Sequence, residues 1–166
     1  MNKWYTTGLA LFVLINMSAQ NGPEGAISSV LDHWHEAAAK ADFDGYFGYM
    51  APGAVFIGTD ATEYWTGEEF KTFAKPYFDK GKAWSFTSVE RHIYVDDAGE
   101  IAWFDELLDT QMELCRGSGV LKRVGGSWKI AHYVLSLAVP NDDVDKVVAL
   151  KKESDSLLIL KLNRRQ

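Results

Sequence analysis

Four consecutive segments with β-strand character follow Lys82, and this run constrains the fold more than any other feature of the chain. An Asp-Asp-Ala-Gly turn separates the first two segments, and Gly125-Gly126 is a strong two-residue hairpin signal before the last one. The pattern predicts strands that pair largely antiparallel with their sequence neighbours. The segments cover residues 84–95, 101–113, 117–124 and 127–139.

Helical periodicity precedes these strands. Apolar residues recur at steps of three and four after Pro23, which a first helical turn tolerates. Thr66 and Glu69 form a capping box that predicts the start of a second helix, and Pro76 is expected to kink or end it. Helices followed by antiparallel strands predict an α+β domain with the helices packed on one face of a curved sheet. The first apolar stripe comprises Ala26, Ile27, Val30, Leu31, Trp34, Ala38 and Ala41.

The last strand carries apolar residues on both of its faces. Its even positions include Trp128 and Ile130, and its odd positions include Tyr133 and Leu135. Neither face of such a strand can be left in water, so one should cover the helices and the other needs a second cover. A second copy of the chain is the economical cover, and we expect a homodimer formed through the sheet.

Residues 1–19 have the pattern of a secretory signal peptide, with Lys3 before an almost wholly apolar stretch and the small Ala19 at the expected cleavage point. The apolar stretch is far shorter than the roughly 20 residues of a membrane span. We therefore expect export to the periplasm or the extracellular space, without stable membrane insertion. A single domain is expected at residues 20–140, followed by a helical tail at residues 141–166.

Charge and composition exclude several functional classes. The chain without residues 1–19 has 16 basic and 23 acidic residues, a net charge of −7, which argues against nucleic-acid binding. The single cysteine, Cys115, cannot form an internal disulfide and is expected to be a buried small side chain. His33 and His35 diverge on a helix, so no metal site is expected. No phosphate loop, nucleophile elbow or redox cysteine pair indicates a cofactor.

Two motifs in their order resemble the SnoaL-like branch of the nuclear transport factor 2-like (NTF2-like) superfamily. They are Gly58-Thr59-Asp60-x-x-Glu63 before the second helix and Gly126-x-Trp128-Lys129-Ile130-x-His132 in the last strand, and the resemblance covers residues 24–140.

The resemblance implies a cone-shaped α+β barrel, with a curved antiparallel sheet wrapped around N-terminal helices, an internal cavity and, usually, a dimer through the sheet. Members include isomerases, cyclases, dehydratases, hydrolases and non-enzymatic binding domains, so the fold does not imply an activity. Relatives often end the last strand with His-x-Ser, where this chain has Val134 before Leu135-Ser136.

Asp60, Glu63 and His132 are the candidate catalytic residues. A carboxylate in an apolar, aromatic pocket has a raised pKa and suits proton abstraction beside a carbonyl. The alternative is structural, with Asp60 accepting backbone N–H bonds in its turn and Glu63 paired with a basic residue. His132 could shuttle a proton or be an ordinary core histidine. On a regular strand it cannot share a cavity with Tyr133.

Five further residues are candidate ligand contacts. Tyr46, Tyr49 and Trp65 combine apolar surface with hydrogen-bonding tips, as cavity walls do, although ordinary core packing explains them equally well. Trp103 and Asp105 share one face of the second long strand, opposite Phe104 and Glu106. Either this pair lies inside the barrel, or one of its members is a rim residue facing solvent.

Three functions remain open from the sequence. The first is binding of a small apolar or aromatic molecule in the barrel cavity. The second is cofactor-independent acid–base catalysis by an isomerase, cyclase, dehydratase or hydrolase that uses Asp60 or Glu63 with His132. The third is a protein-interaction module whose sheet is the contact surface.

Overall fold

The structure is a computed structural model that describes residues 22–164, so the expected signal peptide at residues 1–19 lies outside the described residues. The chain divides into two compact units, one ending at Ser136 and the other beginning at Leu137. The second unit contains the 3₁₀ turn η1 (Asn141–Asp143) and helix α4 (Val144–Asn163), which has no buried residue. Among residues 22–164, no helix has both the length and the apolar character needed to cross a membrane.

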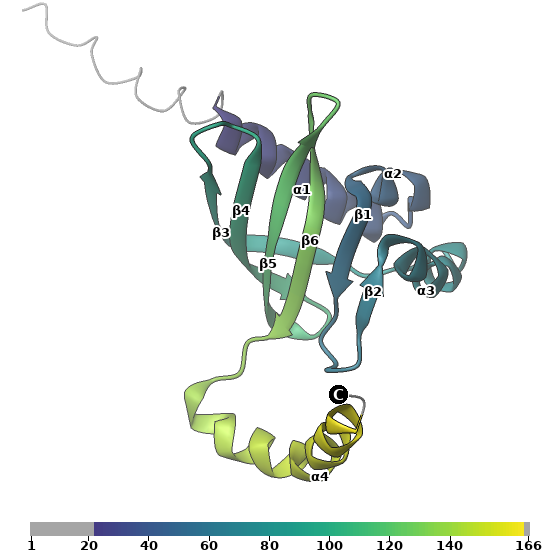
Figure 1. The fold of residues 1–166 in the computed structure, drawn as a ribbon, viewed down its shortest axis with the longest axis vertical. Coiled ribbons are helices and arrows are strands. Elements are labelled where there is room, and N and C mark those ends of the chain that lie inside the picture. The colour runs from purple at the N-terminus through teal and green to yellow at the C-terminus, as the bar shows by residue number, and fades with distance from the viewer. Residues whose placement is uncertain (1–21, 165–166) are drawn as a thin grey trace, which may run out of the picture. The chain divides into compact units, whose positions relative to one another are not determined.

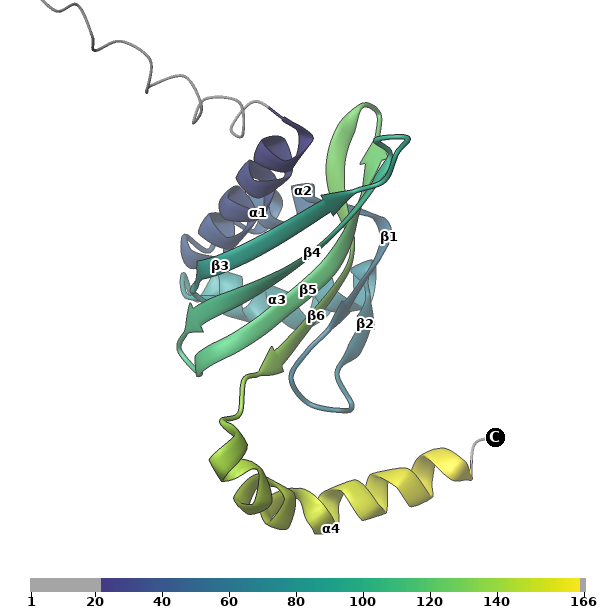
Figure 2. The same ribbon diagram turned by 90° about the vertical axis from the view of Figure 1, so that its left-hand side faces the viewer.

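The first unit consists of three helices and a six-stranded curved sheet with the strand order β2-β1-β6-β5-β4-β3 (Figure 1). Figure 2 shows the sheet curving past α1, which lies against one of its faces. The elements are α1 (Pro23–Ala39), α2 (Phe43–Gly48), β1 (Met50–Ile57), β2 (Tyr64–Thr66), α3 (Gly67–Asp79), β3 (Phe86–Val95), β4 (Ile101–Thr110), β5 (Glu113–Val124) and β6 (Ser127–Leu137).

One pairing differs from the antiparallel sheet that the sequence predicts. The β3–β4 and β4–β5 pairs are antiparallel, as is β1 with the short β2, whereas β1 lies parallel to β6 and places Phe56 opposite Tyr133. Parallel neighbours need a long crossover connection, and α3 with β3, β4 and β5 supplies it between β1 and β6. No local turn signal could indicate this pairing.

Local signals in the sequence act as expected at two junctions. Gly125 and Gly126 have φ angles of +58° and +81°. These are the left-handed values that a type I′ hairpin turn requires. At the start of α3, the Thr66 N–H donates to Glu69 Oε2 at 2.8 Å, as in a capping box. The helix does not end at Pro76 but continues to Asp79, and burial of Phe78 against the core stabilises this last turn.

The alternation of β6 slips by one residue in mid-strand. Trp128 and Ile130 are buried, and the next buried residues are Tyr133 and Leu135, all four in one hydrophobic cluster. The irregularity coincides with a register shift in the β1–β6 pairing. The two apolar faces inferred for a regular strand are therefore largely one face, so β6 alone does not require a second copy of the chain as a cover.

Aromatic rings fill the space between the helices and the sheet. Trp34 of α1 lies 5.0 Å from Tyr46 of α2 and 4.8 Å from Tyr133 of β6, measured between ring centroids. Phe56 of β1 stacks on Phe70 of α3 at 4.0 Å. These contacts join all three helices to the sheet. Aromatic pairs of this kind add to the free energy gained by burial.

Two strands, β3 and β5, have irregular or tightly packed positions. β3 is an edge strand whose register with β4 shifts between Ser88 and Glu90. In the middle of the sheet, Gly119 of β5 lies opposite Phe104, and a Cβ at this glycine would collide with the His132 carbonyl oxygen and the Phe104 ring.

Gly119→Ala is therefore expected to lower the free energy of unfolding by roughly 1–3 kcal/mol, because the backbone oxygen cannot move aside without displacing β6. Gly48→Ala is the matched control, since nothing lies within 4 Å of a Cβ at that position. Urea unfolding of the two variants and the wild type measures the difference. Equal midpoints for the two alanine variants would contradict the close packing of β5 against β6.

Candidate functional site

A pocket of about 170 Å³ lies among β1, β2, α3 and the ends of the strands that follow. Its walls are mostly aromatic, and we call it the aromatic pocket. The rings are Phe56, Trp65, Phe70, Phe73, Trp84 and Phe86. The other lining residues are Gly58, Thr59, Glu63, Gln111, Met112 and Leu135.

The β1–β2 hairpin and the start of α3 build most of this wall. The hairpin pairs Phe56 with Trp65 across the two strands. The capped first turns of α3 then place Phe70 and Phe73 three residues apart, which puts both on one side of the helix. Trp65 stacks on Phe73 with 4.3 Å between ring centroids and on Phe70 with 5.6 Å. The Gly58–Glu69 segment, prominent in the sequence, thus builds a pocket wall.

The two carboxylates of this segment have different surroundings. Asp60 Oδ1 accepts hydrogen bonds from the Thr62 hydroxyl at 2.6 Å and the Thr62 N–H at 2.8 Å, and these bonds lower the pKa of Asp60 below its usual value. Asp60 is exposed and is not among the lining residues. Glu63 lines the pocket, and its Oε2 accepts a hydrogen bond from the Asp60 N–H at 3.1 Å. Asp60 therefore shapes the turn that positions Glu63.

Of the three aromatic residues proposed as ligand contacts, only Trp65 lines the aromatic pocket. Tyr46 lies in the core, and burial raises the pKa of its hydroxyl well above the usual value. Tyr49 is half-buried beside the His33 ring, and its carbonyl oxygen accepts a hydrogen bond from the Ile130 N–H at 2.9 Å. Their polar tips therefore do not converge with that of Trp65.

The remaining predicted residues lie on the outer face of the sheet, which faces away from the helices. Trp103 is 47% exposed and stacks on Tyr94 at 5.8 Å, while Asp105 pairs with His92 at 3.1 Å. His132 precedes the core residue Tyr133, so strand alternation turns it outward. The structure thus does not bring His132 together with Glu63, and Trp103 and Asp105 do not lie inside the barrel.

The inward face of β4 instead carries a carboxylate that the sequence analysis did not select. Glu106 is fully buried. Its Oε1 lies 2.8 Å from His35 Nε2, and its Oε2 accepts hydrogen bonds from Arg91 Nη2 at 2.8 Å and Nε at 2.9 Å. The Tyr133 hydroxyl lies 3.4 Å from Oε1. One signal was available, because His35 follows Leu31 by four residues and so lies on the apolar stripe of α1.

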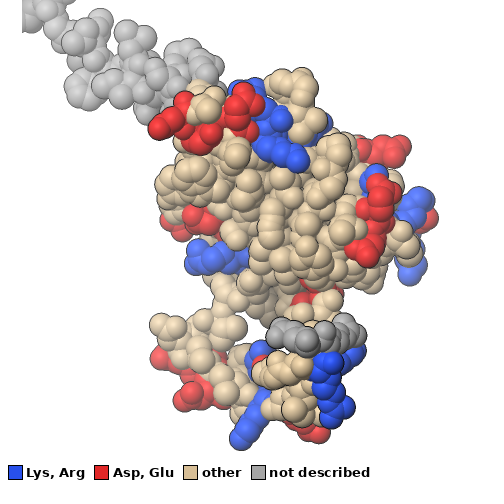
Figure 3. All heavy atoms as spheres, in the orientation of Figure 1, with Lys and Arg blue, Asp and Glu red and all other residues tan. Residues whose placement is uncertain are grey.

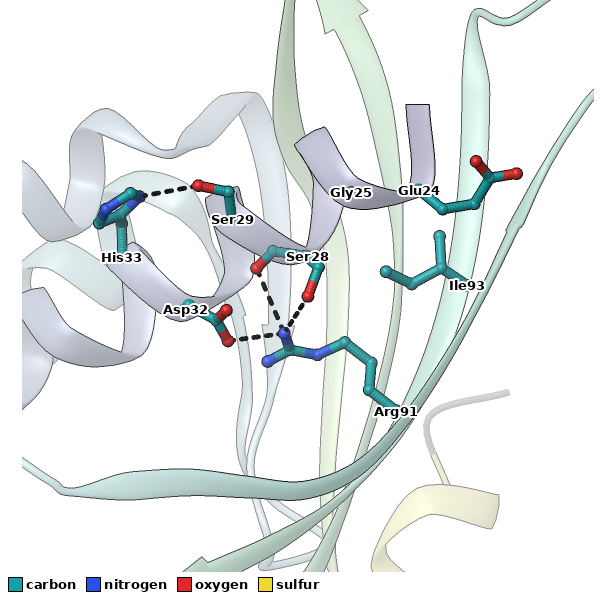
Figure 4. A pocket seen from close by; sticks show the side chains of 8 residues that line it. All are labelled: Glu24, Gly25, Ser28, Ser29, Asp32, His33, Arg91 and Ile93. Atoms are coloured by element: carbon teal, nitrogen blue, oxygen red, sulfur yellow. Dashed lines mark hydrogen bonds and ion pairs between the residues drawn. The ribbon is translucent and has the colours of Figure 1, made fainter. Parts of the chain in front are cut away.

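Arg91 extends this network to the surface of α1, where Figure 4 shows its guanidinium facing Ser28 and Asp32. Nη1 donates to Asp32 Oδ1 at 2.6 Å and to Ser28 Oγ at 2.9 Å. A larger, polar pocket of about 500 Å³ lies here. Because the guanidinium is engaged by two carboxylates and a serine, it is poorly suited to bind an additional anion.

The electrostatics of Glu106 favour the charged form of its carboxyl group. Burial alone would raise the pKa of this carboxyl, but His35 and Arg91 outweigh burial and lower it below its usual value of 4.5. Burial, followed by the nearby Glu106 charge, raises the pKa of Tyr133 well above its usual value. A carboxylate with this many partners and no exposure suits a structural role better than proton transfer.

The profile of the SnoaL-like domain family matches residues 27–140, which is more than half of the chain. The chain belongs to this family. No curated protein matches the sequence of this SnoaL-like domain. Within residues 22–164, no group of three or more His, Cys, Asp or Glu side chains is arranged to hold a metal ion.

Solved structures with the same fold have low sequence identity to this SnoaL-like domain. An NTF2-like protein of unknown function from Pseudomonas putida is 16% identical, with a TM-score of 0.60 over 71% of this chain and 88% of that one. A protein from Streptomyces avermitilis, named provisionally as a dehydratase of the NTF2-like family, is 13% identical, with a TM-score of 0.60 over 70% and 96%. The association domain of CaMKII from C. elegans is 19% identical, with a TM-score of 0.56 over 68% and 94%.

These similarities confirm the predicted α+β cone fold and the NTF2-like relationship. At such low sequence identities, the solved structures bear on the fold alone and carry no activity over to this chain.

The Glu106 network predicts a specific pH dependence of stability. Because the folded-state pKa of Glu106 lies below its unfolded value, its contribution is complete above the unfolded pKa and is lost as pH falls through the folded pKa. Glu106→Gln is expected to lower the free energy of unfolding by about 3–5 kcal/mol near neutral pH, since Arg91 and His35 lose a buried partner. It should also flatten the acid limb of the stability curve, that is, the loss of stability as pH falls. Urea unfolding between pH 7 and 3 measures both effects.

Asp109→Asn serves as the control, because it removes an exposed carboxylate from the outer face of the same strand. This variant should keep the acid limb of the wild type. If Glu106→Gln also kept it, Glu106 would not be the group whose protonation destabilises the fold.

Proposed function

We propose that this SnoaL-like domain binds a small, largely apolar or aromatic molecule in the aromatic pocket. The observation that supports this function is the composition of the wall, six aromatic rings with few polar groups. Ligand sites typically combine such apolar walls with a small number of placed polar side chains. Here Glu63, Gln111 and Thr59 are the polar side chains that could fix the orientation of a ligand.

Three rings of the wall are buried, namely Phe56, Phe70 and Phe86. Another part of the wall differs from the aromatic core in its accessibility. Trp34, Tyr46 and Tyr133 are at most 1% exposed and pack on one another, whereas Phe73 is 36% exposed and Trp65 is half-buried. Apolar rings that remain accessible gain free energy when a ligand removes them from water. The pocket is smaller than the roughly 300–1,000 Å³ of sites for drug-sized ligands, which favours a small molecule or one small group of a larger molecule.

Cofactor-independent acid–base catalysis is the second candidate function. Glu63 is the pocket carboxylate that favours it, and a general base must lie within hydrogen-bond reach of the proton that it removes. The Streptomyces avermitilis protein named as a dehydratase is compatible with such a reaction on this fold. Asp60 and His132 are not among the lining residues, so an isomerase, cyclase, dehydratase or hydrolase reaction would depend on Glu63.

The outer face of the sheet supports a further proposal, that the chain forms a homodimer through this face. The proposal that the chain is exported rests on the sequence pattern of residues 1–19 alone. Large apolar side chains are exposed on the outer face, and Figure 3 shows a broad uncharged area over the sheet with charged residues toward its margins. Contiguous exposed apolar surface is typical of contact sites. Another protein is the alternative partner, as for an interaction module. The exposed residues include Tyr94, Ile101, Trp103 and Leu114.

Phe73→Asp tests the binding proposal. A carboxylate in place of this accessible ring should weaken binding of toluene by about tenfold or more, because it replaces apolar wall with a hydrated charge. Ligand-observed NMR titration of toluene measures the affinity. Tyr77→Asp is the matched control, one turn further along α3, 46% exposed and outside the lining. Equal loss in both variants, or no toluene binding to the wild type, would contradict binding in this pocket.

Trp103→Asp tests the homodimer. Sedimentation of residues 20–166 should show a dimer for the wild type and a monomer for this variant, because a charge in the centre of an apolar contact has no partner. Ala98→Asp, in the exposed turn between β3 and β4, should remain dimeric. A monomeric wild type at micromolar concentration would refute the proposal.

A further inference from the structure

The aromatic pocket has an electrostatic character beyond its apolar walls. Glu63 is the one ionisable side chain among its described lining residues, and no Lys, Arg or His accompanies it. The rings add to this asymmetry, because the face of an aromatic ring carries partial negative charge. Three of the rings are buried, namely Phe56, Phe70 and Phe86. A ligand therefore meets the carboxylate together with the accessible parts of the rings, chiefly Trp65 and Phe73, without a compensating cation from the wall.

The Glu63 carboxylate is held in place. Its Oε2 accepts the Asp60 N–H, and the Gly58 backbone packs so closely against the carboxylate that a Cβ at Gly58 would collide with it. Asp60 is in turn fixed by its bonds to Thr62. Glu63 is half-buried, so its charge is partly desolvated and gains more from a cationic partner than an exposed carboxylate does.

We infer that the ligand carries a quaternary or methylated ammonium group, which the rings and Glu63 bind together. This inference rests on the proposed function and names the ligand class for the same pocket. Aromatic cages recognise quaternary ammonium groups because a cation over the face of a ring is attracted by the ring's electron density. An anionic ligand is disfavoured, because it would face Glu63 without a basic side chain.

Methylation matters because of the N–H donors that it removes. A primary ammonium group has three N–H donors, and each needs an acceptor when it leaves water. The acceptors among the lining side chains are few: the Glu63 carboxylate, whose Oε2 already accepts the Asp60 N–H, the Thr59 hydroxyl, and Gln111 Oε1, which lies 3.4 Å from the Ser85 N–H. A quaternary ammonium group has no N–H donors, so the aromatic wall can surround it without leaving one unsatisfied.

Choline and its neutral isostere 3,3-dimethylbutan-1-ol test this inference, because the two probes share their shape and differ in charge. Calorimetric titration of the wild type should show choline binding at least about tenfold more tightly than the neutral alcohol. Glu63→Gln keeps an acceptor for the Asp60 N–H and removes the charge, so it should reduce this preference severalfold. Glu68→Gln is the matched control, an exposed carboxylate of α3 outside the aromatic pocket, and should retain the preference.

The outcomes separate this inference from the proposed function. Equal affinities for choline and the alcohol, or a choline preference that Glu63→Gln leaves unchanged, would overturn the ammonium inference while toluene binding still supports the pocket. Binding of toluene without binding of choline would overturn it as well. If neither choline, the alcohol nor toluene binds to the folded wild type, both the inference and the proposed function are wrong.

Discussion

The buried carboxylate of Glu106 is the interaction on which the arrangement of helix and sheet depends. It accepts hydrogen bonds from Arg91 on β3 and lies within hydrogen-bond distance of His35 on α1, while Arg91 also reaches Asp32. Since a buried charge is costly unless every partner is in place, this network permits one position of α1 across the strands. Apolar contacts alone, which are non-directional, would specify that position less sharply.

The position of α1 in turn determines what the aromatic residues can do. Trp34 packs against both Tyr46 and Tyr133, and these rings fill the space behind the sheet, so the interior near α1 is core rather than cavity. Aromatic surface stays accessible where β1, β2 and α3 meet, around Trp65 and Phe73. The network and the aromatic pocket use different residues, so the features that stabilise the fold are separate from those available to a ligand.

The sequence predicted much of the fold and part of the candidate site. Turn and cap signals act locally, which is why Gly125-Gly126 and the Thr66–Glu69 box were interpretable from the sequence. Strand alternation shows which residues of β4 share a face but not which face is inside, and a tryptophan is ordinarily a better core residue than Glu106. Arg91 lies opposite Glu106 on the paired strand β3, but His35 lies 71 residues away on α1. Because local patterns do not bring α1 onto β4, the burial of Glu106 in place of Trp103 could be seen only in the tertiary structure.

The sheet is open, and one of its margins is the ten-residue strand β3. Unpaired backbone groups at such a margin are a template for adding strands from other molecules, the first step toward fibrous aggregates. Two features described above oppose that growth. The register shift between Ser88 and Glu90 interrupts the regular spacing of backbone donors and acceptors, and Glu90 and His92 place polar, ionisable groups along the strand. The edge is thereby protected against polymerisation while the outer face of the sheet remains free for specific contacts.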